Sequence, residues 1–168
     1  ILPAMLKDWG LDFSQIGVTL GIIAPISVLI GAIVAGYLIN RLGRIRSLLF
    51  FGLLQLISAL GYIVLSIYYD QPTITTIIPF IIIDHFISGL TTVALFSVMM
   101  DWSRKSQPGN DYTFMDCVSV FAMMLGTGIS YGISAKWGYS INFIIALPLI
   151  IISLYIVWKT YNKIKKNN

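Results

Sequence analysis

Asp84 and His85 are adjacent ionisable residues near the middle of a long apolar segment, residues 73–102. Helical spacing would align Asp84 with three hydroxyl side chains, those of Ser88, Thr91 and Thr92. A charged carboxylate facing lipid at mid-membrane costs about 2.5–3.5 kcal/mol on insertion scales, so Asp84 is expected to face protein or water. Histidine side chains titrate near neutral pH, which suits proton coupling. The polar stripe therefore predicts a solute path or a proton relay. The alternative is that Asp84 hydrogen-bonds a neighbouring helix and His85 packs in its neutral form.

A second pattern, Gly128-Ile129-Ser130-Tyr131-Gly132, has the Gly-x-Ser-x-Gly spacing of a hydrolase nucleophile. That nucleophile needs a strand-to-helix turn and a base within reach, and an apolar helix does not provide the turn. Small residues at helix contacts explain the same letters. Cys117 is the single cysteine, and there is neither a Gly-Lys-Ser/Thr loop nor a His-Glu-x-x-His motif. We therefore expect a protein that is not an enzyme and that holds no metal or cofactor.

The elements that must position Asp84 and His85 follow from the composition. Of the 168 residues, 57% are hydrophobic and only 11% are charged, against about 25% charged in ordinary soluble domains. Stretches of about twenty apolar residues span a hydrocarbon core of roughly 30 Å, and in lipid they must be helices. Five such stretches predict an all-α integral membrane protein, a single helical bundle over residues 1–168, with spans at about 14–39, 47–68, 73–102, 112–136 and 139–158.

Small residues and prolines indicate how these helices pack. Gly17-x-x-x-Gly21 and Gly128-x-x-x-Gly132 have the spacing that lets transmembrane helices approach closely. Pro25, Pro79 and Pro148 lie inside spans, where each would bend its helix. Residues 1–6 are also apolar and resemble the tail of a preceding helix, so we expect a chain that is truncated on its N-terminal side.

Basic residues cluster at the ends of the spans rather than among exposed aromatic residues, so nucleic acid is not an expected partner. Helix alternation places nine of the eleven Lys and Arg residues on one side, leaving Lys7 and Lys136 on the other. The positive-inside rule makes the richer side, which includes the C-terminus, cytoplasmic. The nine residues are Arg41, Arg44, Arg46, Arg104, Lys105, Lys159, Lys163, Lys165 and Lys166.

The turn after the first span carries a more specific pattern, Gly36-x-x-x-Asn40-Arg41-x-Gly43-Arg44, with Arg46 close behind. It resembles Gly-x-x-x-Asp-Arg-x-Gly-Arg-Arg, the cytoplasmic loop signature of the major facilitator superfamily. Asn40 stands where the signature has an acid, and the second arginine comes one place late. The resemblance implies a gate in which arginines pair with acids or with helix C-termini. A loop that only sets topology is the alternative.

A second connection contains Asp101, Arg104, Asp111 and Asp116. It resembles the region between the fourth and fifth helices of the C-terminal half in the AmpG-like branch of that superfamily, which includes muropeptide and siderophore permeases. The resemblance implies a gating role for these residues. Local structure offers another reading, in which Asp101 pairs with Arg104 at the end of one helix and Asp111 or Thr113 caps the next.

Together, the resemblances imply five of the six helices of one half of a permease in the cytoplasmic (inner) membrane. Its partners would be membrane lipid, a small-molecule solute and the missing N-terminal half. Such a protein works by alternating access as a secondary transporter, here expected to be proton-coupled. A siderophore-like solute is the first expectation and a muropeptide-like solute the second. The alternatives are a non-transporting membrane subunit or scaffold, and an inactive fragment of a transporter.

Overall fold

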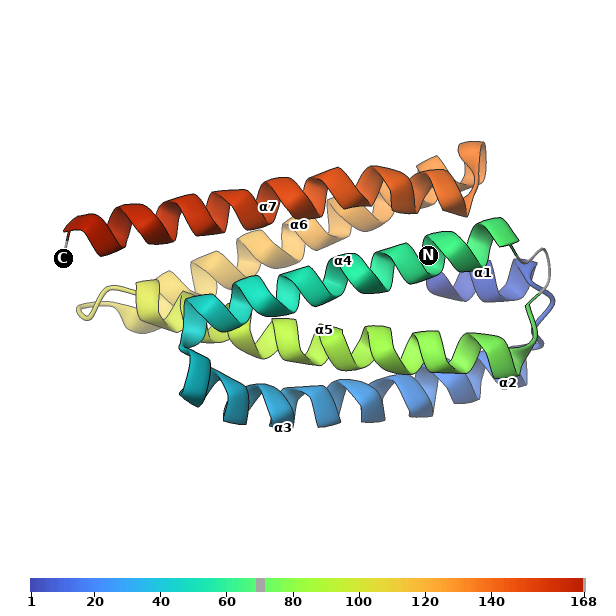
Figure 1. The fold of residues 1–168 in the computed structure, drawn as a ribbon, viewed down its shortest axis with the longest axis horizontal. Helices are drawn as coiled ribbons and strands as arrows, with labels where there is room; N and C mark the ends of the chain where they lie inside the picture. The colour runs from blue at the N-terminus through green and yellow to red at the C-terminus, as the bar shows by residue number, and fades with distance from the viewer. Residues whose placement is uncertain (69–71, 168) are drawn as a thin grey trace.

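The computed structural model describes residues 1–68 and 72–167, and these residues are helical throughout apart from short turns (Figure 1). The elements are α1 (Leu2–Asp8), α2 (Phe13–Val18), the π-helical turn η1 (Thr19–Ile23), α3 (Ala24–Leu42), α4 (Arg44–Tyr68), α5 (Ile74–Trp102), α6 (Pro108–Trp137) and α7 (Tyr139–Asn167). Because α2, η1 and α3 are continuous, five helices are long and apolar enough to cross a membrane. The five expected spans are confirmed, except that the expected connection at 69–72 lies mostly outside the described residues.

The long helices run side by side, so successive turns alternate between the two ends of the bundle (Figure 1). The turn at Gly43, residues 103–107 and the C-terminal end of α7 lie at one end, which we call the basic end. The turn after α1 and the turn at Gly138 lie at the opposite end. This arrangement matches the alternation expected from the spans.

Proline explains the one irregular stretch inside a span. The π-helical turn Thr19–Ile23 ends two residues before Pro25, which lies in the first turn of α3. A proline ring clashes with the carbonyl four residues earlier and donates no backbone hydrogen bond, and a locally wider helix relieves both problems. Pro79 and Pro148 lie inside α5 and α7.

Helix α5 is the centre of the packing: it lies along most of α3 and also against α4. Helix α4 packs against α7 as well as against α5, and α6 makes most of its contacts with α7. No residue of α6 is fully buried within the described chain. The outward-facing side chains of all five long helices are mainly large and apolar, as a lipid-facing surface requires.

Two apolar clusters fill the interior. Near the α1 end, Met5, Leu6 and Trp9 pack against residues of α3, α4 and α5, including Tyr62 and Ile81. Towards the basic end, Ala35 and Ile39 of α3, Phe51 of α4 and Leu90 and Ala94 of α5 form the second cluster. Asp84 belongs to the stretch of α5 between these clusters.

The glycines that allow close approach are not the two pairs expected from spacing. A Cβ added at Gly31 of α3 would overlap the backbone of Phe86, and one at Gly89 of α5 would overlap the backbone of Val28. A Cβ at any member of the Gly17/Gly21 or Gly128/Gly132 pairs would have no neighbour within 4 Å. The small-residue contact therefore joins α3 to α5.

Gly89→Ala is expected to destabilise the fold by about 1–3 kcal/mol, because the new methyl group would overlap the backbone of α3, which cannot move aside. Gly128→Ala is the matched control and should change stability by less than about 0.5 kcal/mol. Thermal unfolding of both purified variants in detergent measures the difference. Equal melting temperatures would contradict the close α3–α5 contact.

Two connections are shorter than the sequence suggested. Helix α3 continues to Leu42 and α4 begins at Arg44, so Gly43 alone forms the turn that was expected to span residues 40–46. Its φ of 84° is a conformation that glycine adopts without strain, and Gly138 does the same between α6 and α7. The expected helix start at Asp111 or Thr113 is wrong, because α6 begins at Pro108, with Gln107 in the N-cap position.

Candidate functional site

Asp84 is held by two side chains of the neighbouring helix α4. Its Oδ1 accepts hydrogen bonds from the Gln55 amide at 3.1 Å and from the Ser58 hydroxyl at 2.6 Å. The Asp84 side chain is 23% exposed, so most of it is covered by other parts of the protein. The expectation of an inward-facing acid is consistent with this geometry. Hydrogen bonds to a charged acceptor offset part of the cost of placing a carboxylate inside a bundle.

His85 lies beside this carboxylate, with its Nδ1 3.8 Å from the Asp84 Oδ2. The same Nδ1 is 3.0 Å from the carbonyl oxygen of Ile81. A carbonyl oxygen can only accept a hydrogen bond, so Nδ1 is the donor and carries a proton. In the neutral ring Nε2 is then the nitrogen without a proton. Asp84 and His85 thus bring two ionisable side chains together inside the bundle.

Sequence reasoning missed the partners of Asp84 on α4. Gln55, Ser58 and Tyr62 are three and four residues apart, which places them on one face of the helix. Tyr62 is only 4% exposed and stacks on Phe143 at 5.3 Å between ring centroids. Its hydroxyl has no hydrogen-bond partner among the described residues. Polar side chains at this spacing in an otherwise apolar span are the signal that would have found them.

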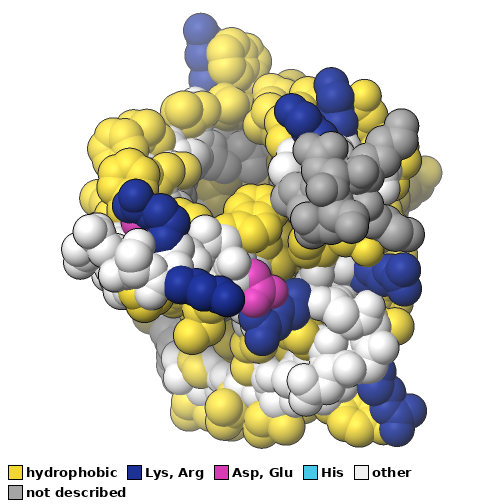
Figure 2. Space-filling model, turned by 90° about the vertical axis from the view of Figure 1, so that its left-hand side faces the viewer, with side chains coloured by type: hydrophobic (Ala, Val, Ile, Leu, Met, Phe, Trp, Pro, Cys, Tyr) yellow, Lys and Arg dark blue, Asp and Glu magenta, His cyan; other side chains and the backbone are white. Residues whose placement is uncertain are grey.

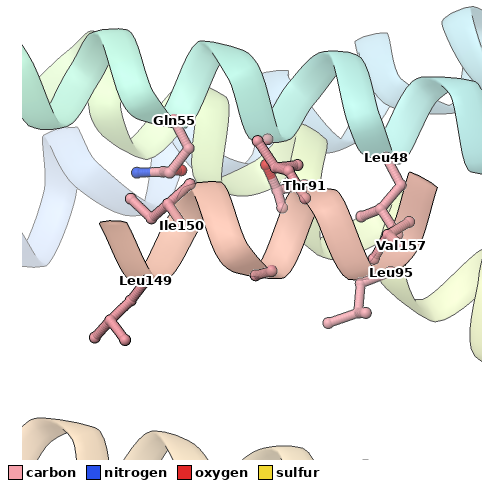
Figure 3. A pocket seen from close by; sticks show the side chains of 10 residues that line it. Leu48, Gln55, Thr91, Leu95, Leu149, Ile150 and Val157 are labelled. Atoms are coloured by element: carbon pink, nitrogen blue, oxygen red, sulfur yellow. The ribbon is translucent and has the colours of Figure 1, made fainter. Parts of the chain in front are cut away.

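A cavity of about 420 Å³ opens between α4, α5 and α7 (Figure 3). We call it the inner cavity. Its polar lining residues are Gln55 of α4, Thr91 of α5 and Ser153 of α7. The other lining residues are apolar or glycine: Leu48, Gly52, Leu95, Leu149, Ile150, Leu154 and Val157. Such a cavity, apolar with a few convergent polar groups, has the character of a small-molecule site.

The expected polar stripe of α5 reaches this cavity at one point. Thr91 lines it, with its hydroxyl donating to the carbonyl oxygen of Ile87 at 3.0 Å. Ser88 is half-buried and Thr92 is exposed, and neither lines the inner cavity. Asp84 does not line the cavity itself, but Gln55 both lines it and donates to the Asp84 carboxylate.

At the basic end, Arg44 forms an ion pair with Asp101, which lies 57 residues later in the chain. Arg44 begins α4 and Asp101 lies at the end of α5, so the pair joins two span ends that are distant in sequence. Both side chains are about half exposed, at 49% and 48%. Asp101 thus supplies an acid next to a turn whose own signature position holds Asn40. Figure 2 shows this end of the molecule, where Lys and Arg side chains gather around an acidic group.

The other residues of the arginine turn have different surroundings. Arg41 lies over the ring of Tyr37 on its own helix, 4.6 Å from the ring centroid. Gly36 and Asn40 are exposed on α3. Arg46 lines a shallow hollow together with Arg44 and Asp101. The turn therefore presents one paired arginine and further arginines that engage no acid among the described side chains.

The second connection is closed by a bidentate contact between Arg104 and Asp111. The Arg104 Nε and NH2 groups each donate to the Asp111 carboxylate at 2.8 Å, and the Arg104 backbone N–H donates at 2.9 Å. The side-chain hydrogen bonds to Asp111 and its negative charge raise the pKa of Arg104. The expected local pair of Asp101 with Arg104 is wrong, since each has a different partner. Asp116 is half-buried further along α6.

The opposite end is tied by side-chain hydrogen bonds that involve no basic residue. The Tyr139 hydroxyl donates to the Asp8 carboxylate at 2.6 Å, which joins α1 to the start of α7. Ser130 donates to the Asn142 carbonyl oxygen at 2.7 Å, which joins α6 to α7. Ser130 therefore has a structural partner, and His85 lies on a different helix. Within the described chain, no cluster of three or more His, Cys, Asp or Glu residues is placed to bind a metal ion.

Five apolar helices of membrane-spanning length define a multi-pass membrane protein. The chain belongs to the Major Facilitator Superfamily, whose sequence profile matches residues 1–168. It is similar to the Anhydromuropeptide permeases of Escherichia coli strain K12 and strain O157:H7, with 30% identity over 118 residues in each case. The aligned part is 68% of this chain and 23% of each permease, so the chain spans about a quarter of the length of these relatives. The expected membership of the major facilitator superfamily, a family of transporters rather than enzymes, is confirmed by these relationships.

Proposed function

We propose that this chain is part of the C-terminal half of a secondary transporter that moves a solute by alternating access and couples it to protons. The observation that carries the proposal is the Asp84–His85 pair, held inside the bundle by Gln55 and Ser58, next to a cavity that a solute can enter. A proton on this pair would be shielded from bulk water, which coupling requires. The remaining helices of the transporter would complete the solute path.

An anhydromuropeptide is the solute class that we propose. The support is the similarity to two permeases with that name. The uncharged lining of the inner cavity, with one amide and two hydroxyl groups, suits an uncharged part of such a solute. A siderophore remains the competing solute, on the resemblance of the second connection alone.

Uptake by the full-length protein in proteoliposomes tests this function. Radiolabelled anhydromuropeptide should accumulate when the vesicle interior is made alkaline, and a ferric siderophore should not. Empty liposomes provide the background. Accumulation of the siderophore alone would show that the solute is a siderophore and not an anhydromuropeptide. Absence of transport for both would favour a non-transporting membrane subunit.

The basic end is proposed to face the cytoplasm, because most Lys and Arg residues lie there. A reporter enzyme that is active only in the periplasm should therefore be inactive when fused after Asn168 and active when fused within the turn at Gly138. The matched pair controls for expression. The reverse pattern of activity would contradict the proposed orientation.

A further inference from the structure

Gln55 occupies two environments at once. Its amide nitrogen donates to the Asp84 Oδ1 at 3.1 Å, and its side chain lines the inner cavity. In Figure 3 it extends from α4 towards Ile150 of α7. Ser58 donates to the same carboxylate oxygen but does not line this cavity. Of the described side chains that hold Asp84, Gln55 is the one that a solute in the cavity can touch.

The cavity offers a solute few other hydrogen-bond donors. The Thr91 hydroxyl already donates to the carbonyl oxygen of Ile87, and Ser153 is the remaining hydroxyl in the lining. None of the described lining residues is charged. A solute group that accepts a strong hydrogen bond, such as an amide or carbonyl oxygen on a mainly apolar body, must therefore draw it chiefly from the Gln55 amide.

We propose that Gln55 is the positioning residue that links the proton on Asp84 to the solute in the inner cavity. This inference rests on the proposed function of proton-coupled transport. The ionised carboxylate holds the amide through a charge-assisted hydrogen bond, which is about twice as strong as a neutral one. When Asp84 binds a proton this hydrogen bond weakens, and the Gln55 amide can turn to donate a hydrogen bond to the solute.

The sign of this coupling follows from linkage. The Gln55 amide nitrogen carries two N–H donors, and a solute that turns the amide towards the cavity weakens the one that Asp84 accepts, so it promotes protonation of Asp84. By reciprocity, a proton on Asp84 strengthens solute binding. Proton and solute are then bound together and released together, which is symport.

Other ionisable groups near Asp84 are few. His85 lies on the same helix, and Tyr62 lies one turn beyond Ser58 on the same face of α4. The α3 residues that pack against this part of α5, Val28, Gly31 and Ala32, are not ionisable. Within the described chain, Asp84 and His85 are therefore the pair of ionisable side chains through which a proton would respond to the cavity.

A tethered amide tests the link without requiring a known solute. The full-length protein is made without cysteines, which includes Cys117→Ser, and Ser153→Cys then places a single thiol in the inner cavity. Iodoacetamide attaches an acetamide group there. Infrared difference spectra in lipid nanodiscs at one fixed pH report the protonated carboxyl band of Asp84, which Asp84→Asn identifies.

Alkylation should raise the ratio of protonated to ionised Asp84 about tenfold, the size expected for losing one hydrogen bond to a charged group. The response should disappear in Gln55→Met, which keeps the side-chain length without the amide. It should persist in Ser58→Ala, which also removes a hydrogen bond to Asp84 but leaves the cavity lining unchanged. The Ser58→Ala variant thus controls for general disturbance of the carboxylate.

Two results would overturn the proposal: no response in the parent protein, or the same response in Gln55→Met as in the parent. Failure of the proposed function looks different, because the infrared response would be present while reconstituted vesicles accumulate neither solute. If vesicles accumulate solute normally but the infrared response is missing, coupling through Gln55 is wrong and the transport function stands.

Discussion

Asp84→Asn is expected to eliminate the accumulation of solute that a pH gradient drives in proteoliposomes. One pH unit corresponds to about 1.4 kcal/mol per proton, or tenfold accumulation for a one-to-one symporter, so a gradient of two units would support about a hundredfold accumulation. The variant should lose this factor and only equilibrate the solute. Asparagine retains the oxygen that accepts hydrogen bonds from Gln55 and Ser58, so the fold should be preserved.

His85→Gln should act differently, by slowing the proton steps. General acid–base groups contribute about 10²–10⁴-fold to the rates of the steps they serve. We expect the variant to slow the initial rate of uptake by a factor at the low end of that range and to change its dependence on pH. Ser97→Ala is a suitable control, because the Ser97 hydroxyl only donates to the Val93 carbonyl oxygen of its own helix. If both variants at the Asp84–His85 pair kept the parental accumulation and pH profile, the pair would serve packing alone.

Arg44→Ala is expected to slow transport up to about fivefold, because its ion pair with Asp101 joins the ends of α4 and α5 at the proposed cytoplasmic gate. A half-exposed pair is worth up to about 1 kcal/mol, which shifts a two-state equilibrium about fivefold but leaves expression and insertion intact. Initial uptake rates, normalised to the amount of inserted protein, measure the effect.

The matched control is Arg41→Ala, since Arg41 stacks on Tyr37 of its own helix and should have a smaller effect. Asp101→Ala should resemble Arg44→Ala, and the double variant should be no slower than either single variant, as coupled residues require. Exchanging the two charges should restore part of the rate. Additive losses in the double variant would show that the ion pair is not the functional unit.

The spans and their alternation could be predicted from the sequence because lipid leaves an apolar segment of some twenty residues only one structure. The transporter class was also within reach, since the Gly36 to Arg46 pattern resembles a superfamily signature and the family relationship bears it out. The inward orientation of Asp84 was predicted from the cost of a charge in lipid, and its hydrogen bonds to Gln55 and Ser58 agree with it.

The partners of individual side chains could not be predicted in the same way. Asp101 was paired with Arg104 by local spacing, but the structure pairs it with Arg44, and Arg104 with Asp111. The close-contact glycines are Gly31 and Gly89 rather than the spaced pairs on α2–η1 and α6.

The physical reason is the uniform character of these helices. A soluble helix shows its buried face by a polar opposite face, whereas a helix that is apolar all round carries no such mark. Hydropathy alone determined which residues of this chain cross the membrane and which turns lie together. The rotation of each helix about its axis was decided by tertiary contact, where Gly31 and Gly89 let α3 and α5 touch and Gln55 and Ser58 meet Asp84.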